Sequence, residues 1–354
     1  MTKDVNGARN GQHRRVLMIC SAFPPTGGAG VQRSAKFAKF LPQFGWTPIV
    51  WSCHHLASLP RDDSLLAELP HDLDHRAQSN WDASSWPTRA GDLAAATATL
   101  FRQSGARADG VRWRANRLIR GLVDSIVPDE QGLWALGSLG TLRRVVLRER
   151  IDVIYSTHSP ASNHLLAWRL KLATRVPWVS DYRDLWTDDC WYPFANGPRW
   201  RRSADRFLET RFLRDADAVV GVSPDQTRIL ADRVPHERHK CVTITNGADL
   251  DDFAGIDRPS ARRTVGYESG HDDRFILAHV GRFTAERVTP EMLDGFAKLV
   301  DWLGVRKNQF ELRIVGWMSD RMHRQLRATG LHFTATGYVS HERAVREMVA
   351  ADAL

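Results

Sequence analysis

VLMICSAFPPTGGAGVQR, residues 16–33, is the stretch that decides the fold of this chain. Its first five residues form a continuous apolar run, which is typical of a strand in a parallel sheet covered on both faces. Three glycines then let the backbone approach a ligand closely before a helix opens near Val31. Because the first amides of such a helix point at a bound anion, we predict a phosphate or sugar site that includes Gly28 and Gly30. The same glycines would also suit a tight turn without a ligand.

A nicotinamide dinucleotide site is the alternative interpretation of this turn. That site needs a third glycine near position 33 and an acidic residue at the end of the second strand. Arg33 occupies the first of these positions, and the second predicted strand, residues 48–54, contains no carboxylate. The sequence therefore argues against a dehydrogenase.

The composition is that of a globular protein with a large core. Of the 354 residues, 43% are hydrophobic and 25% are charged, which predicts two domains. The first thirteen residues are polar and the apolar run after them is short, so we expect no signal peptide and a cytoplasmic location. The four cysteines show no paired spacing, and we predict no metal site. A net charge of +8 favours anionic partners, such as a membrane surface.

Apolar strand candidates alternate with helical stretches, which predicts an α/β fold made of doubly wound parallel sheets. A polar, loop-like stretch over 254–274 separates two such series. We therefore predict a Rossmann-like N-terminal domain over residues 1–250 and a second domain of the same type over 251–354. The expected strands are 16–20, 48–53, 151–157, 178–182, 218–223 and 241–245 in the first domain, and 275–281, 310–316 and 332–338 in the second.

The segment from 61 to 130 fits this alternation least well. It contains a predicted amphipathic helix over 111–126, with Trp113, Arg117 and Arg120 away from the apolar face. This helix either packs on the sheet with its basic side in solvent or binds to the surface of an anionic membrane. In the second case we expect weak, salt-sensitive binding to anionic vesicles and little binding to neutral ones, measured by sedimentation. Equal partitioning onto both kinds of vesicle would contradict the electrostatic interpretation.

Two further strand ends of the first domain carry polar residues. The strand 151–157 runs into His158, and ligands bind at strand carboxyl ends in open sheets, although this histidine could also lie in a loop or cap a helix. The next strand continues as DYRDLW, in which Arg183 lies between two aspartates. Such charges are costly to bury unless they pair or bind something, so Arg183 and Asp184 either bind a ligand or form a structural ion pair.

The second domain opens with HVGRFTAER, residues 279–287. Gly281 and Arg282 end its first predicted strand, and Arg287 follows five residues later. Both arginines could be surface charges. Asn246, directly before a glycine, gives a turn signal at the end of the preceding domain.

Taken in order, these patterns resemble those of the family 4 retaining glycosyltransferases, and most closely a bacterial branch that builds surface polysaccharides. The resemblance implies two facing doubly wound domains with a nucleotide sugar between them. In that family the loop at Gly28 and Gly30 faces the donor, the loop at His158 lies near the acceptor, and Asn246 belongs to the hinge. Many relatives have a histidine where Arg183 stands, whereas Asp-x-Arg-Asp-x-Trp is the form of the surface-polysaccharide branch.

The resemblance also assigns a role to the start of the second domain. In the family an arginine and a lysine at this spacing hold the donor diphosphate next to a glycine that corresponds to Gly281. Here the second cation is Arg287, which keeps the charge but replaces a point cation with a planar fork. The reaction would pass through an oxocarbenium-like state without a covalent nucleophile. No cofactor is expected besides the nucleotide diphosphate sugar, which is a substrate.

By the same resemblance, the second domain is expected to be incomplete. A fourth strand would begin in residues 351–354, and an acidic donor-sugar loop, a ribose-binding glutamate and a final helix would follow it. We therefore expect an unpaired apolar edge in this domain, which would make it the less stable half. We also expect these 354 residues to be inactive on their own, because catalysis depends on accurate placement of the reacting groups.

The sequence thus favours a retaining, hexosyl-type glycosyltransferase that acts on a surface glycan, with a lipid-linked acceptor. Arg282 and Arg287 would hold the leaving diphosphate, and His158, Arg183 and Asp184 would line the acceptor side. The expected partners are a nucleotide sugar, the acceptor and an anionic membrane at whose inner face the protein would lie, and nucleic acid is not expected. Two alternatives stay open, a sugar-nucleotide epimerase of the same architecture and a non-catalytic remnant or binding module.

Overall fold

The chain divides into two compact units in a computed structural model that describes residues 14–54, 59–79, 128–190, 192–267, 274–285, 287–302 and 309–354. Unit 1 comprises Met1–Phe23, Gly30–Leu59 and Leu69–Gly247, and unit 2 comprises Pro24–Ala29, Pro60–Glu68 and Ala248–Leu354. The helix expected over 111–126 lies outside the described residues. No helix in the described part of the chain is long and apolar enough to cross a membrane.

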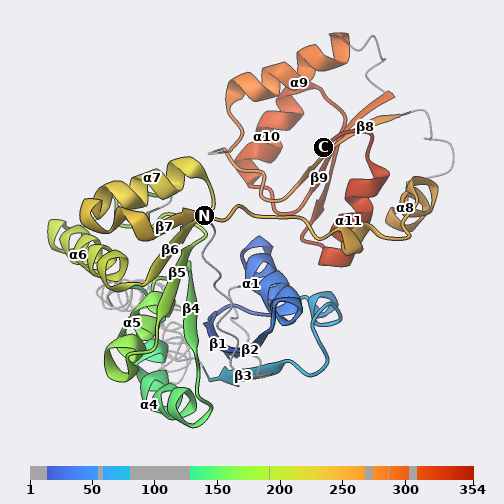
Figure 1. The fold of residues 1–354 in the computed structure, drawn as a ribbon. Helices are drawn as coiled ribbons and strands as arrows, with labels where there is room; N and C mark the ends of the chain where they lie inside the picture. The colour runs from blue at the N-terminus through green and yellow to red at the C-terminus, as the bar shows by residue number, and fades with distance from the viewer. Residues whose placement is uncertain are drawn as a thin grey trace, which may run out of the picture. The chain divides into compact units, whose positions relative to one another are not determined.

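Unit 1 is built on a seven-stranded parallel sheet in the order β3-β2-β1-β4-β5-β6-β7 (Figure 1). The direction in which the chain adds strands reverses between β1 and β4. In open parallel sheets ligands bind beside such a reversal, at the carboxyl ends of the strands. The strands are β1 (Arg14–Ile19), β2 (Trp46–Cys53), β3 (Asp74–Gln78), β4 (Val153–His158), β5 (Trp178–Tyr182), β6 (Ala218–Gly221) and β7 (Cys241–Thr243).

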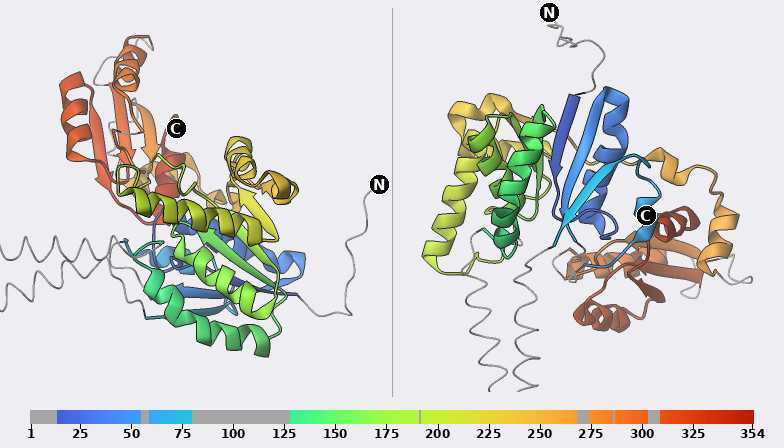
Figure 2. Two further views of the ribbon diagram at one scale, coloured as in Figure 1. Left: turned by 90° about the vertical axis from the view of Figure 1, so that its left-hand side faces the viewer. Right: turned by 90° about the horizontal axis from the view of Figure 1, so that it is seen from below.

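Helices cover both faces of this sheet (Figures 1 and 2). Alternate residues from Leu17 to Cys20 accordingly enter two different cores. Leu17 and Ile19 pack with side chains from α4 (Gly132–Arg148), α5 (Ser162–Thr174), α6 (Arg199–Asp215) and α7 (Pro224–Arg233). Met18 and Cys20 pack instead with side chains from α1 (Ala29–Phe40). The predicted doubly wound parallel architecture is confirmed.

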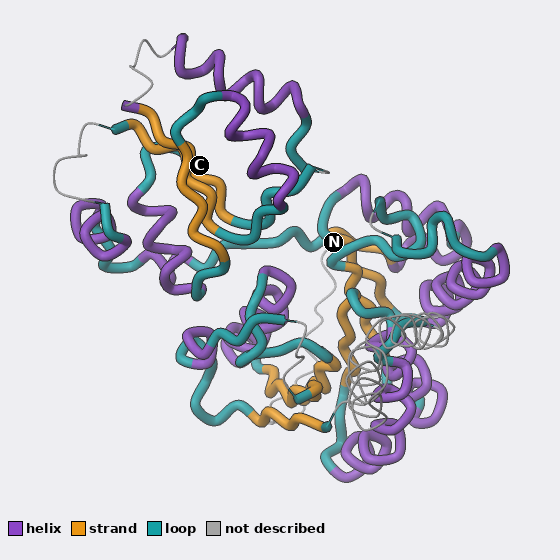
Figure 3. Tube along the Cα trace, turned by 180° about the vertical axis from the view of Figure 1, so that it is seen from behind, coloured by secondary structure: helices purple, strands orange, loops and turns teal. Residues whose placement is uncertain are grey.

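Unit 2 has a three-stranded parallel sheet in the order β10-β9-β8 (orange in Figure 3). Its strands are β8 (Phe275–Val280), β9 (Phe310–Val315) and β10 (Phe333–Gly337). The apolar residues of β9 face α9 (Pro290–Trp302) and α10 (Asp320–Thr329). On the other face of β9, buried Arg313 donates to Glu311 and to Glu347 of α11 (His341–Ala350). These charges are tolerated inside the unit because they are paired.

Two elements differ from the sequence-based expectations. The stretch predicted to be a loop over 254–274 contains helix α8 (Arg258–Val265). Asp257 caps its N-terminus by accepting from the Ser260 N–H, and Gly266 ends it with a φ of 84°. The other element, β3, has the polar sequence DHRAQ and pairs only with β2, so it carries no apolar pattern. Four short 3-10 helices complete the described elements, at Leu41–Phe44, Asp63–Leu66, Pro235–Lys240 and Leu250–Phe253.

The β8 edge of the second sheet is paired at one point. Ala353 forms a parallel bridge with Leu277. The N–H of Ala278 donates to the Ala353 carbonyl at 2.9 Å, and the N–H of Ala353 donates to the Ile276 carbonyl at 3.2 Å. The backbone that follows α11 thus pairs with the middle of β8.

Candidate functional site

The carboxyl ends of β4 and β5 bring together four of the predicted site residues, Gly30, His158, Arg183 and Asp184. The Nδ1 atom of His158 lies 3.0 Å from the carbonyl oxygen of Asp184. The guanidinium of Arg183 donates to the Gly30 carbonyl and pairs with the Asp184 carboxylate, with Nε 3.1 Å from Oδ2. The structural ion pair considered for Arg183 and Asp184 is therefore present, and it lies against the predicted glycine turn.

Gly30 leaves space for the Arg183 side chain. A Cβ atom added to Gly30 would lie 2.8 Å from Nη1 of Arg183 and 3.2 Å from its Cζ, which is too close for an undisturbed contact. The guanidinium is the end of a flexible side chain, so it would move away rather than distort the fold. Gly30 lies within α1 and has no positive φ, so the Arg183 side chain is the reason for glycine at this position.

Gly30→Ala is expected to reduce the glycosyl transfer that the sequence predicts about tenfold without loss of stability, because Arg183 would leave its place beside the turn. Alanine is the better helix former, so the free energy of unfolding should change by less than about 1 kcal/mol. Initial rates and urea unfolding of the purified variant test both parts. Gly140→Ala is the matched control, because Gly140 lies within α4 and its added Cβ would meet no atom within 4 Å. Equal rates for the two variants would contradict the role of Arg183.

His158 is a buried, neutral histidine. Burial lowers its pKa to about 4, although the hydrogen bond to the Asp184 carbonyl acts in the opposite direction. Its ring packs near those of Tyr182 and Trp186, with centroids 5.9 and 6.0 Å away. Since a carbonyl oxygen only accepts, Nδ1 carries the proton and Nε2 keeps a lone pair. His158 can therefore accept a hydrogen bond from a hydroxyl, but it is not a cation near neutral pH.

The burial of this histidine predicts an acid-sensitive fold. Between pH 6.5 and 4 the unfolded chain binds a proton that the folded His158 does not, so stability is complete above 6.5 and falls as the pH drops. The free energy of unfolding should decrease by about 3 kcal/mol over this range from His158 alone. The neighbouring His164, whose pKa burial also lowers, should add to the decrease.

Urea unfolding of the wild type and of His158→Gln at several pH values measures this slope. The variant should show a smaller decrease between pH 6.5 and 4. His236→Gln, the same substitution at an exposed position, serves as the control. A slope that is the same in wild type and His158→Gln would show that His158 is not held neutral.

Asn246 lies on the exposed segment that follows β7. It is bound by Arg33, which was not among the predicted site residues. Its Oδ1 atom accepts from Nη1 of Arg33 at 3.1 Å. Arg33 also forms a two-pronged ion pair with Asp181 of β5, with Nε 2.8 Å from Oδ2. The sequence alone gives no sign of this role of Arg33, because Asp181 and Asn246 are 148 and 213 positions away along the chain.

In unit 2 the carboxyl ends of β8 and β9 meet at two glycines. Gly281 and Gly316 have φ values of 140° and 134°, and a Cβ on Gly316 would lie 2.2 Å from the Gly281 carbonyl oxygen. Arg282 follows directly, is exposed, and has its guanidinium 5.6 Å from the centroid of the Trp317 ring. Arg287 is also exposed, in a turn where its N–H donates to the Thr284 carbonyl. Both arginines that were predicted to bind the diphosphate are therefore accessible to solvent.

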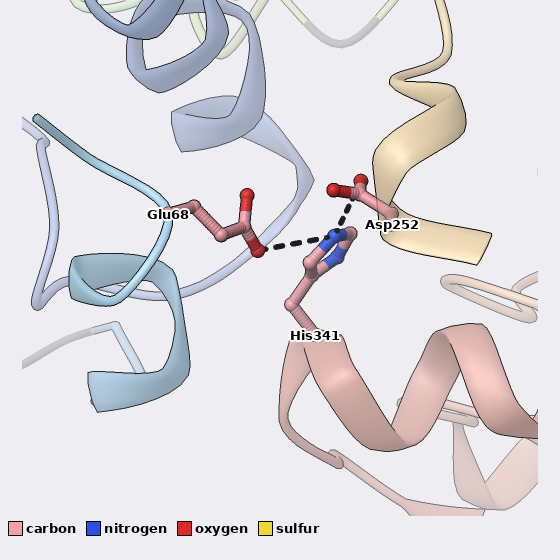
Figure 4. A group of neighbouring side chains, drawn as sticks. All are labelled: Glu68, Asp252 and His341. Atoms are coloured by element: carbon pink, nitrogen blue, oxygen red, sulfur yellow. Dashed lines mark hydrogen bonds and ion pairs between the residues drawn. The ribbon is translucent and has the colours of Figure 1, made fainter. Parts of the chain in front are cut away.

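Gly28 belongs to unit 2 and has a φ of 104°, a conformation that favours glycine. Unit 2 also contains a group that the sequence analysis missed, made of Glu68, Asp252 and His341 (Figure 4). The Nε2 atom of His341 lies 3.0 Å from Asp252 and 3.5 Å from Glu68, and these residue types can hold a metal ion. The three residues are too far apart in the sequence for any spacing rule to find.

Asp62, which is buried, explains how Glu68 reaches this group. The Asp62 carboxylate accepts from the backbone N–H of His341 at 2.7 Å and from the Tyr338 hydroxyl at 3.3 Å. It also caps its own short helix through the Ser64 N–H. A carboxylate at the first residue of α11 is favourable because helix N-termini attract negative charge. These contacts fasten residues 60–68 to α11.

Comparison with known proteins supports the family that the motifs suggest. Residues 97–252 match the model of Glycosyltransferase Family 4. D-inositol 3-phosphate glycosyltransferase of Geodermatophilus obscurus is 24% identical over 182 residues, which cover 48% of this chain and 38% of that protein. The match thus spans well under half of the curated relative.

Two solved structures share the fold at low sequence identity. The Anabaena protein HepE in complex with UDP and glucose is 14% identical, with a TM-score of 0.57, and the match covers 96% of this chain and 73% of that one. A glycosyltransferase from Rickettsia africae ESF-5 is 15% identical, with a TM-score of 0.56, and the match covers 96% and 71%. The family model thus matches the part of the chain over residues 97–252, and the likeness to the two solved structures shows a shared fold.

Proposed function

We propose that this chain belongs to a retaining glycosyltransferase that moves a sugar from a nucleotide diphosphate sugar to a lipid-linked surface glycan. The observation that carries the proposal is the group formed by Gly30, His158, Arg183 and Asp184. It lies at the carboxyl ends of adjacent strands, beside the reversal of strand order, in the unit that matches the family 4 model. Open parallel sheets bind their ligands at this position.

The acceptor would bind to this group of unit 1. The neutral His158 would accept a hydrogen bond from the attacking hydroxyl through Nε2, because Nδ1 is used by the Asp184 carbonyl. Arg183 is held in place by Gly30 and Asp184, and it would bind oxygen atoms of the acceptor. A lipid-linked acceptor would also bring the protein to the inner face of a membrane, which the vesicle assay described above tests.

The donor diphosphate would bind to unit 2 at the end of β8. Gly281 permits close approach of the backbone, and Arg282 and Arg287 are exposed cations on the residues that follow. When the bond between sugar and phosphate breaks, the positive charge develops on the sugar and the negative charge on the departing diphosphate. Arginines already in place stabilise that negative charge as it forms, without further reorganisation.

The experiment that tests the proposal uses the full-length protein as it is encoded. A thermal-shift screen of UDP-, GDP- and ADP-sugars identifies the donor, since binding to the folded state raises the melting temperature. Release of the nucleoside diphosphate that depends on an added lipid-linked glycan is the expected result, and NMR of the product reports whether the anomeric configuration is retained. Conversion of the sugar nucleotide without acceptor would instead indicate an epimerase, and binding without turnover a binding module.

A further inference from the structure

Arg33 uses every hydrogen-bond donor of its side chain on partners within unit 1. A guanidinium offers five N–H groups, and the side chain is 5% exposed. Two of the five donate to the Asp181 carboxylate at 2.8 and 3.0 Å. The other three donate to the Ile244 carbonyl at 2.9 Å, to the Thr245 carbonyl at 3.1 Å and to Oδ1 of Asn246 at 3.1 Å. One side chain therefore connects α1, β5 and the segment after β7.

The Asp181 half of this arrangement is fixed from all sides. The carboxylate is completely buried and accepts a further hydrogen bond from the Tyr155 hydroxyl at 2.6 Å. The guanidinium of Arg33 also lies over the Phe37 ring, 4.8 Å from its centroid, one turn along α1. Burial by itself would lower the pKa of Arg33, but the bonds and charge of Asp181 raise it, so the cation persists. The fork cannot turn away without leaving a buried carboxylate unpaired.

The other three N–H groups of Arg33 bind the last residues of unit 1. Residues 244–247 are exposed, and unit 2 begins again at Ala248. The N–H of Ile244 still donates to the Gly221 carbonyl at 2.9 Å, at the end of the β6–β7 pairing. Beyond that point Arg33 binds two successive carbonyls and the Asn246 side chain. Arg33 therefore sets the conformation of the last residues before the second unit.

We propose that Arg33 is a positioning residue that orients the amide of Asn246 for binding the sugar nucleotide. Because Oδ1 accepts from a guanidinium, which has no acceptor, the Nδ2 group of Asn246 cannot take that place. The two Nδ2 hydrogens are thereby left for an acceptor atom of a ligand, such as a sugar hydroxyl or a phosphate oxygen. The inference rests on the proposed function and extends it to Arg33, which is not one of the residues proposed to bind the diphosphate.

The chain contains a matched control for this arrangement. Arg201 is 1% exposed and donates from Nε to Asp205 at 2.9 Å, while the Tyr192 hydroxyl donates to the same carboxylate at 2.6 Å. This second buried set of arginine, aspartate and tyrosine also lies in unit 1, where Arg201 donates to the Pro128 carbonyl and lies over the Phe194 ring. Arg201→Lys therefore reproduces the loss of a buried fork without touching residues 244–247.

The first test is hydrogen exchange of backbone amides in Arg33→Lys and Arg201→Lys. Lysine has three donors on one atom and cannot bridge the carboxylate and the segment as a fork does. Both variants should lose stability, but only Arg33→Lys should speed exchange of the Ile244 amide, which donates to the Gly221 carbonyl, by about tenfold, the equivalent of one charged hydrogen bond. The same exchange rates in the two variants would overturn the proposal, and this test needs no ligand.

The second test separates the two ends of the Asn246 amide. Asn246→Asp keeps an oxygen for Arg33 but has no Nδ2 donor, so exchange of the segment should stay as in the wild type. Its affinity for UDP-glucose, or for the sugar nucleotide selected by the screen, should fall about tenfold, which corresponds to one lost hydrogen bond. In the double variant with Arg33→Lys the losses of affinity should not add.

Wild-type affinity of Asn246→Asp, or strictly additive losses, would overturn the assignment of Asn246 as the group that Arg33 positions. If the wild type binds no sugar nucleotide at all, the proposed function fails instead. In that case the exchange experiment still decides whether Arg33 controls the segment. Asn246→Asp is a change at an exposed position and should fold, so the proposal stays testable even where Arg33→Lys does not.

Discussion

Arg282→Ala is expected to lower the turnover of the proposed glycosyl transfer at least about a hundredfold, the effect of removing one group that stabilises developing charge. Arg282 follows Gly281 at the end of β8, is exposed, and is oriented by its contact with the Trp317 ring. Its guanidinium would bind more strongly to the departing diphosphate than to the intact donor. The loss should therefore appear mainly in kcat, with a smaller change in KM.

Steady-state kinetics of the full-length protein measure this effect, with Arg321→Ala as the control. Arg321 is an exposed arginine on α10, so its replacement removes the same charge from another surface of unit 2. The control should keep wild-type kinetics, which would separate a specific contact from the general attraction of an anionic substrate to a basic protein. Wild-type turnover in Arg282→Ala would remove the diphosphate assignment.

Asp181→Ala is expected to destabilise unit 1 by about 3–5 kcal/mol, because it leaves the buried Arg33 cation without its partner. The substitution also leaves the Tyr155 hydroxyl without the carboxylate that it now binds at 2.6 Å. Asp184→Ala, only three residues further along the same DYRDLW stretch, should cost less than about 1 kcal/mol. Asp184 is half exposed, and its ion pair with Arg183 is open to water.

Equilibrium urea unfolding followed by tryptophan fluorescence compares the two variants. The buried Trp178, on the same strand, reports on unit 1. A difference of several kcal/mol between the variants is the expected result. Similar losses for both would mean that the Arg33–Asp181 pair contributes no more than a surface ion pair, and it would remove the basis for treating Arg33 as fixed.

The sequence by itself determined the local elements and the candidate residues at their ends. Alternating apolar strands and helices predicted the parallel sheets, and the glycine turn and the Gly281–Arg282 pair marked strand ends that the structure confirms as such. These signals are readable because apolar periodicity and turn chemistry are properties of neighbouring residues. Where the pattern is weak, the prediction failed: β3 is polar because it lies at a sheet edge, and the caps of α8 specify that helix more than apolar residues do.

Only the tertiary structure decided which charged residues meet. The motif DYRDLW shows two aspartates beside one arginine, but not that Asp181 pairs with Arg33 while Asp184 pairs with Arg183. That division follows from the strand order and register, since β5 lies next to β4 with Asp181 opposite Thr157. The same holds for Asn246, whose partner lies on α1, and for Glu68, Asp252 and His341, which come from three distant segments. Periodicity fixes which face of a strand is buried, whereas an ion pair depends on which strands become neighbours, and no local pattern records that.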